Sequence, residues 1–150
     1  MSSSCDGTMR KWRCDTGRLV GEPWQGDSTG SIHALALSPD GKTIACRNDH
    51  GSVQQWDTDG EIKDVWATVE SAVASLSWSP CGAYIAGGTI LIRKSDNGEV
   101  EVGPIETNQC LVNGVAYSSS GDRITSGGDG TIRIWDSKTG EPLVSPVEDL

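Results

Sequence analysis

The 150-residue chain is acidic, with a formal net charge of −9 and 35% hydrophobic residues, and its length has room for one ordinary domain. This charge disfavours nucleic acid and anionic membranes as partners, because binding to phosphates requires a basic face; a partner selected by charge would be a basic protein. No apolar run approaches the roughly 18 residues of a membrane span, and the first residues lack the apolar stretch of a signal peptide. We therefore expect a cytoplasmic protein, with the nucleus as the alternative location.

Five cysteines, at positions 5, 14, 46, 81 and 110, form no Cys-x-x-Cys pair. Their odd number and their spacing favour reduced thiols over a disulfide framework or a zinc site. We expect neither a bound metal nor a cofactor.

Three copies of a similar segment follow one another, and each contains a short turn that ends in glycine, at Gly41, Gly82 and Gly121. These glycines are 41 and 39 residues apart, and a fourth copy is represented only by its second half, near the N-terminus. A repeat of about 40 to 45 residues with four short strands and a Trp-Asp pair is typical of a propeller blade. The sequence therefore predicts an all-β, incomplete β-propeller of about three and a half four-stranded blades.

Apolar alternation and turn residues predict the strands in chain order. The partial copy contributes a strand at residues 8–12 and a second strand that runs to Pro23. The first complete repeat has strands at 32–37, 42–46 and 52–56, the second at 73–78 and 83–86, and the third at 112–117, 123–126 and 131–135. Later repeats end in strands near Pro104 and Pro146. Because proline cannot donate to a ladder, these last strands are expected at the outer edge of each blade.

The repeats divide the chain into a half blade at 1–26, a blade at 27–68, a degenerate blade at 69–107 and a blade at 108–150, with fourteen strands in all. Because a blade buries its faces against its neighbours, this number leaves an apolar face open at each end. Three explanations remain open: a fragment of a larger propeller, closure by self-association, and a degenerate gene product of little stability.

Residues 129–136 read DGTIRIWD, and residues 6–12 and 51–57 echo this motif. The motif resembles the WD40 repeat. The Gly-x5-Pro ending of the repeats, followed by a Ser-Pro-Asp-Gly turn, is similar to the repeats of fungal NACHT-type receptor-like proteins. The resemblance implies a non-catalytic propeller whose faces and central channel bind other macromolecules.

In that family a turn Asp, a His before the first strand, a Ser or Thr and the Trp form a buried hydrogen-bond network. The resemblance assigns structural roles to eight residues: Asp6, Trp12, Trp56, Asp57, Ser126, Asp129, Trp135 and Asp136. Ser3 is the expected partner of Trp12. The His is missing throughout, and nothing comparable precedes Leu111, so each network is predicted to be incomplete. The degenerate blade has Arg93 and Lys94 in place of Trp-Asp, and we expect it to be the least stable.

Two apparent chemical signals favour structural roles. Residues 57–61 resemble the start of a calcium loop, but Thr68 stands where such a loop requires a bidentate Glu, so a hairpin turn is favoured. His33 and His50, the only histidines, lack the positioned partner that base catalysis requires. His50 stands where other repeats have the turn Asp.

Trp24, Trp66 and Trp78 could form an aromatic binding surface, although their alignment with apolar positions favours packing. The serines at 2–4 and 118–120 lack a Gly-x-Ser-x-Gly elbow and a base. We therefore interpret the chain as a non-catalytic protein-interaction module from the sensor region of a larger receptor-like protein. One alternative is a structural segment that completes a propeller by self-association or with another chain. The other is an enzyme or small-molecule-binding propeller, which would need polar residues lining the central channel, and the repeats have none in common.

Overall fold

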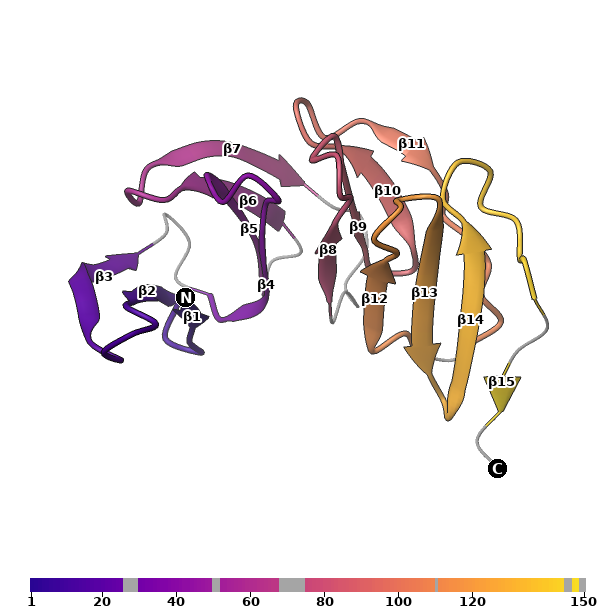
Figure 1. Ribbon diagram of the computed structural model, residues 1–150, viewed down its shortest axis with the longest axis horizontal. Helices are drawn as coiled ribbons and strands as arrows, with labels where there is room; N and C mark the ends of the chain where they lie inside the picture. The colour runs from indigo at the N-terminus through magenta and orange to yellow at the C-terminus, as the bar shows by residue number, and fades with distance from the viewer. Residues whose placement is uncertain (26–29, 50–51, 68–74, 110, 145–146, 149–150) are drawn as a thin grey trace.

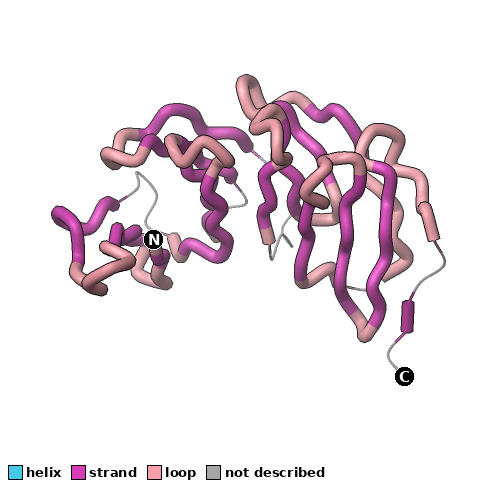
Figure 2. The backbone as a smooth tube through the Cα atoms, viewed as in Figure 1, coloured by secondary structure: helices cyan, strands magenta, loops and turns pink. Residues whose placement is uncertain are grey.

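Four antiparallel β-sheets follow one another along the chain in the computed structural model, which describes all residues except 26–29, 50–51, 68–74, 110, 145–146 and 149–150. Figure 1 places the first sheet at one end of the molecule and the fourth at the other, and Figure 2 shows only strands and loops in the described chain. The first strands of successive sheets lie side by side, as they do around the axis of a propeller. The predicted all-β, incomplete β-propeller is confirmed.

In every sheet the strands pair in chain order. The first sheet contains β1 (Ser2–Ser3), β2 (Thr8–Trp12) and β3 (Leu19–Gln25). The second contains β4 (Ile32–Leu37), β5 (Thr43–Asn48), β6 (Ser52–Asp57) and β7 (Ile62–Ala67). The third contains β8 (Leu76–Trp78), β9 (Tyr84–Gly87), β10 (Leu91–Lys94) and β11 (Val100–Val102). The fourth contains β12 (Gly114–Tyr117), β13 (Arg123–Gly128), β14 (Thr131–Asp136) and β15 (Val147–Glu148).

The first sheet has three strands, so the prediction of two strands for the partial copy was wrong. The additional strand, β1, contains only two serines and therefore has no apolar alternation that sequence reading could detect. β4 has the predicted bounds, whereas β12 begins at Gly114 rather than at residue 112. Val112 is buried but precedes the ladder, because apolar periodicity reports burial rather than backbone pairing. Residues 73–74 of a predicted strand lie outside the described residues.

The glycine turns of the three complete repeats share one geometry. Gly41, Gly82 and Gly121 have φ angles of 72°, 74° and 78°, a left-handed conformation in which any side chain is strained. Their N–H groups donate to the carbonyl three residues earlier at 2.9, 2.9 and 3.0 Å. Each turn therefore needs glycine at its last position.

The last strand of each sheet pairs on one side only and forms the outer edge, as predicted. Pro23 lies within β3 and Pro104 lies two residues after the end of β11, which are positions where a missing N–H is tolerated. Pro146 lies outside the described residues.

The core consists of three apolar clusters, each between two neighbouring sheets. The first cluster joins Met9 to Ile44, Cys46 and Trp56; the second joins Ala45, Val53 and Trp66 to Ile85; the third joins Ile90 and Ile105 to Ile124 and Trp135. We call the face of a sheet that contacts the next sheet its trailing face, as with Met9, and the face that contacts the previous sheet its leading face, as with Trp56. Stability therefore depends on contacts between sheets, as in other repeat architectures.

Candidate functional site

A buried hydrogen-bond chain surrounds the tryptophan of the fourth sheet. The Trp135 indole N–H donates to Ser126 Oγ at 3.0 Å, and the Ser126 hydroxyl donates to Gln109 Oε1 at 2.9 Å. Gln109 Nε2 in turn donates to Thr131 Oγ1 at 2.9 Å and to the Gly128 and Thr131 carbonyls at 3.1 Å. The expectation that nothing replaces the missing His before Leu111 was wrong, because Gln109 fills this role.

Glutamine can replace histidine here because its amide carries both an acceptor and a donor. Its position two residues before Leu111 was the only signal in the sequence, and it was missed because the comparison considered histidine alone. Asp129 lies beside this network with a φ of 54°, and its carboxylate accepts a hydrogen bond from the Leu111 N–H at 3.3 Å. Asp129 therefore ties the β13–β14 turn to the segment that precedes β12.

The tryptophan of the first sheet makes a different contact from the one expected. The Trp12 indole N–H donates to Ser2 Oγ at 2.8 Å, so the expected partner, Ser3, was wrong by one residue. The pairing of Ser3 with Met9 turns the Ser3 side chain to the opposite face, because successive side chains alternate along a strand. Asp6 accepts from the Thr8 N–H at 2.9 Å and from the Thr8 hydroxyl at 2.6 Å, and these bonds lower its pKa.

In the second sheet the tryptophan is buried next to a thiol. Cys46 occupies the place of Ser126, because each pairs with the residue two positions before the tryptophan. The Trp56 Nε1 atom has no hydrogen-bond partner among the described residues. Burial raises the pKa of the Cys46 thiol to about 11, while the nearby Trp56 N–H acts in the opposite direction. The second sheet thus retains the packing of the network but not its strong hydrogen bond.

The turn Asp of the second repeat is Asp49 and not the position of His50. Asp49 Oδ2 accepts from the Ser31 N–H at 2.8 Å, the same contact that Asp129 makes with Leu111. The β5–β6 loop is one residue longer than the β13–β14 loop. Alignment of the repeats by sequence therefore placed His50, rather than Asp49, opposite Asp129. His50 itself lies outside the described residues.

His33 does have a positioned partner, contrary to expectation. Its Nε2 atom contacts Asp49 Oδ1, and this contact, followed by the Ser31 N–H, lowers the pKa of Asp49. Both side chains are about half exposed. The pair links β4 to the turn after β5.

Arg93 occupies the tryptophan position of the third sheet, since it pairs with Ile85 as Trp135 pairs with Ile124. Its guanidinium is partly buried and donates to the Gly98 carbonyl at 2.8 Å. The Arg93 side chain therefore links β10 to the turn between β10 and β11.

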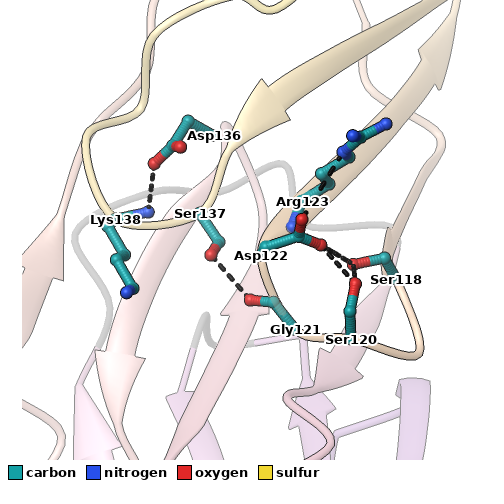
Figure 3. Close-up of polar contacts among 8 residues, drawn as sticks. All are labelled: Ser118, Ser120, Gly121, Asp122, Arg123, Asp136, Ser137 and Lys138. Atoms are coloured by element: carbon teal, nitrogen blue, oxygen red, sulfur yellow. Dashed lines mark hydrogen bonds and ion pairs between the residues drawn. The ribbon is translucent and has the colours of Figure 1, made fainter.

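In each four-stranded sheet the turn between the first and second strands lies at the same end as the turn between the third and fourth strands, and we call this end the turn end. Figure 3 shows this end of the fourth sheet, where Ser137 Oγ donates to the Gly121 carbonyl at 2.7 Å. Asp122 accepts from the hydroxyls of Ser120 and Ser118, which lower its pKa. Asp136 accepts from the backbone N–H groups of its own turn, and this lowers its pKa as well.

Asp57 and Asp40 hold the turn end of the second sheet in the same way. The Asp57 carboxylate accepts from the N–H groups of Asp59 and Glu61 at 2.9 Å, and the hydrogen bond from Glu61 is the main cause of its lowered pKa. The Asp40 carboxylate accepts from the Ser38 hydroxyl, which lowers its pKa. Residues 57–61 thus form a hairpin turn.

Two grooves separate neighbouring sheets at the turn end. The first groove, between the second and third sheets, has a volume of about 660 Å³ and is lined by Asp40, Asp64, Asp96, Lys63 and Trp78 among others. The second groove, between the third and fourth sheets, has a volume of about 380 Å³. Cys81 lines both grooves, and hydrogen bonds from Ser79 and from the Ala83 backbone lower the pKa of its thiol.

The eight residues predicted to have structural roles lie in the first, second and fourth sheets and do not meet in one site. Of the other three tryptophans, Trp66 is buried and Trp24 and Trp78 pack against the clusters between sheets. The described cysteines at 5, 14, 46 and 81 are free thiols, and Cys110 lies outside the described residues. Within the described ranges no group of three or more His, Cys, Asp or Glu side chains is arranged to hold a metal, and no helix there has the length and apolar character to cross a membrane.

The four-stranded sheets, their Trp-Asp strands and the network of the fourth sheet define a propeller of repeated blades. The family model described as "WD domain, G-beta repeat" matches residues 18–57 and 101–136, just over half of the chain. The chain therefore belongs to the WD40 repeat family.

Similar proteins occur in animals, plants and fungi. The chain is 28% identical over 126 residues to the mouse U3 small nucleolar RNA-associated protein 4 homolog, a match that covers 74% of this chain and 18% of the mouse protein. It is 27% identical over 142 residues to the Arabidopsis thaliana protein named cell division cycle 20.1, cofactor of APC complex, covering 91% of this chain and 31% of the relative. It is 26% identical over 128 residues to the Saccharomyces cerevisiae APC/C activator protein CDC20, covering 77% and 20%. The chain thus spans a third or less of the length of these relatives.

Proposed function

We propose that this chain is a non-catalytic protein-interaction module and that its first groove receives a basic segment of a partner protein. The negative charge of the groove is the basis of the proposal. Its lining contains three carboxylates, those of Asp40, Asp64 and Asp96, and one lysine, Lys63. A cleft lined mainly by one sign of charge attracts the opposite charge. Trp78 lines the same groove and provides an aromatic face on which a guanidinium can stack.

Membership of the WD40 family supports the general role, because WD40 proteins generally act as scaffolds. Two relatives are named as a cofactor and as an activator of the APC complex. We carry over to this chain only the binding of other proteins, and we propose a basic partner from the groove itself.

Calorimetric titration with a Lys/Arg-rich peptide at low and high salt tests the proposal. We expect binding that weakens as salt rises, because exposed charges are screened over about 8 Å at physiological ionic strength. Asp96→Lys, which reverses an exposed charge in the groove, should weaken binding about tenfold, or about 1.4 kcal/mol.

The matched control is Asp59→Lys, which makes the same charge change at an exposed turn residue outside the groove lining. Equal loss of binding in both variants would show that overall charge rather than the groove attracts the peptide. Preference for an acidic peptide would contradict the proposal directly.

We also propose that the module belongs to the sensor region of a larger receptor-like protein and works in the cytoplasm or nucleus. The Gly-x5-Pro endings that begin at Gly17, Gly98 and Gly140 and the Ser-Pro-Asp-Gly turn at residues 38–41 support this context. Sequencing of the flanking coding region should reveal further repeats and an upstream nucleotide-binding domain, and a different upstream domain would contradict the receptor context. Imaging of the tagged protein in cells checks its location.

A further inference from the structure

A third cavity lies between the outer parts of the third and fourth sheets, and we call it the outer pocket. It has a volume of about 450 Å³. Its lining comes from the end of β11 and the segment after it on one side, and from β14 and the turn after β14 on the other. The two sides touch at Gly140, because a Cβ built there would lie 3.0 Å from Val102 Cγ1 and 3.1 Å from Ile105 Cδ1. Both walls therefore belong to neighbouring sheets of this chain.

Arg133 is the only cation among the residues that line the outer pocket. It shares a face of β14 with Trp135, because side chains alternate along a strand, and Trp135 packs in the cluster between the third and fourth sheets. The Arg133 Nε atom is buried and has no hydrogen-bond partner among the described residues. The guanidinium also forms no ion pair with a described carboxylate.

Most polar groups held between packed elements have a partner inside the protein. Arg93 of the third sheet follows this rule, because it donates to the Gly98 carbonyl. Ser126, which lies opposite Arg133 on β13, is already engaged by Trp135 and Gln109. Partial burial of a charged group without a partner is unfavourable. The guanidinium therefore gains more from an anion that enters the pocket than a fully hydrated side chain would.

The other lining residues favour a carboxylate next to an apolar group. Pro104, Ile105 and Pro142 supply apolar surface. The planar fork of a guanidinium matches the two oxygens of a carboxylate. Glu106 is exposed, lines the same pocket and repels an anion in proportion to its charge. A single carboxylate is therefore favoured over a phosphate dianion.

We propose that the outer pocket binds an Asp or Glu side chain of a partner protein. The carboxylate lies on Arg133, and an adjacent apolar residue of the partner packs against Pro104 and Pro142. This site goes beyond the basic segment proposed for the first groove. The pocket and the groove share no lining residue, so either proposal can fail alone.

Nuclear magnetic resonance titration of the full 150-residue chain tests the proposal. The probes are the capped peptide acetyl-Gly-Leu-Glu-Gly-amide and two matched peptides with Gln or phosphoserine in place of Glu. We expect the Glu peptide to shift the indole N–H signal of Trp135 and to bind more tightly than the other two. Arg133→Met should weaken its binding about tenfold or more, as for loss of a charge-assisted hydrogen bond. Glu106→Gln should tighten binding about twofold to fivefold, because it removes a like charge near the surface.

The matched control is Arg10→Met, which makes the same change at the exposed residue two positions before Trp12, outside the pocket lining. This variant should bind the Glu peptide as the wild type does. Arg133→Met should still bind the Lys/Arg-rich peptide with the salt dependence of the wild type, and basic and acidic peptides are compared at the groove in this variant.

Three results would overturn the proposal: no binding of the Glu peptide to the wild type, equal binding of the Gln or phosphoserine peptide, or an equal loss in Arg10→Met. Unchanged binding in Glu106→Gln would also overturn it. Because Glu106 is exposed, this last test does not depend on whether Arg133→Met folds.

Discussion

Replacement of Gln109 by alanine should destabilise the fourth sheet more than its partly exposed position suggests. The substitution removes the acceptor of the buried Ser126 hydroxyl and the donor to Thr131 Oγ1. Ser126 is 1% exposed, so its hydroxyl loses its acceptor in a buried environment. Leaving one such buried polar group unsatisfied costs roughly 1 to 3 kcal/mol. With about 2 to 4 °C per kcal/mol for a chain of this size, the melting temperature should fall by roughly 2 to 12 °C.

Urea and thermal unfolding of matched variants isolate this effect. Gln109→His should stay within about 1 kcal/mol of the wild type, because imidazole also offers a donor and an acceptor. Asn113→Ala, an exposed side chain close to the same strand, should change the free energy of unfolding by less than about 0.5 kcal/mol. If Gln109→Ala proved as stable as Asn113→Ala, the hydrogen-bond chain would not support the sheet and the reasoning would be refuted.

Further predictions follow from burial. Trp135→Ala should cost roughly 3 to 5 kcal/mol, whereas Arg93→Ala should cost about 1 kcal/mol or less, the value of its single hydrogen bond; equal losses in urea melts would contradict this ranking. Cys46 should resist alkylation in the folded protein at neutral pH while the exposed cysteines react, as mass spectrometry would show. Because burial raises the Cys46 pKa from 9.0 to about 11, its contribution to stability is present below pH 9.0 and is lost as the pH rises towards 11, which melts across this range would detect. Elemental analysis after dialysis should find less than one equivalent of zinc or calcium.

The repeated elements could be predicted from the sequence because three copies report the same signal. β4 was predicted to the residue, and the glycine turns followed from the spacing of Gly41, Gly82 and Gly121. β1 could not be found in this way, since two serines at a sheet edge carry no periodicity. The exposure of Ile132 could not be predicted from the sequence either, because it depends on what packs against the fourth sheet rather than on the repeat itself.

The polar networks were less predictable than the strands because they tolerate exchange of side-chain type. Gln109 supplies the donor and the acceptor that were sought in a histidine. Asp49, rather than the position of His50, makes the turn contact, since one extra loop residue shifts the alignment. Motif matching compares residue types, whereas the network requires only a donor or acceptor at a point in space. Such substitutions become visible only with the coordinates.

Under the proposed function, the acidic side chains of the turn end affect association and dissociation of the basic partner differently. The carboxylates of Asp40, Asp57 and Asp136 already accept hydrogen bonds within their own turns, and these bonds lower their pKa values. They therefore stay ionised and, under the function proposed above, would attract the basic segment at long range, but their oxygens already accept hydrogen bonds within the turns. Asp96 makes no side-chain hydrogen bond among the described residues, and it lines the first groove. Salt should consequently slow association with a basic partner through all of these charges, whereas loss of Asp96 should mainly speed dissociation, because it removes a contact made only in the complex.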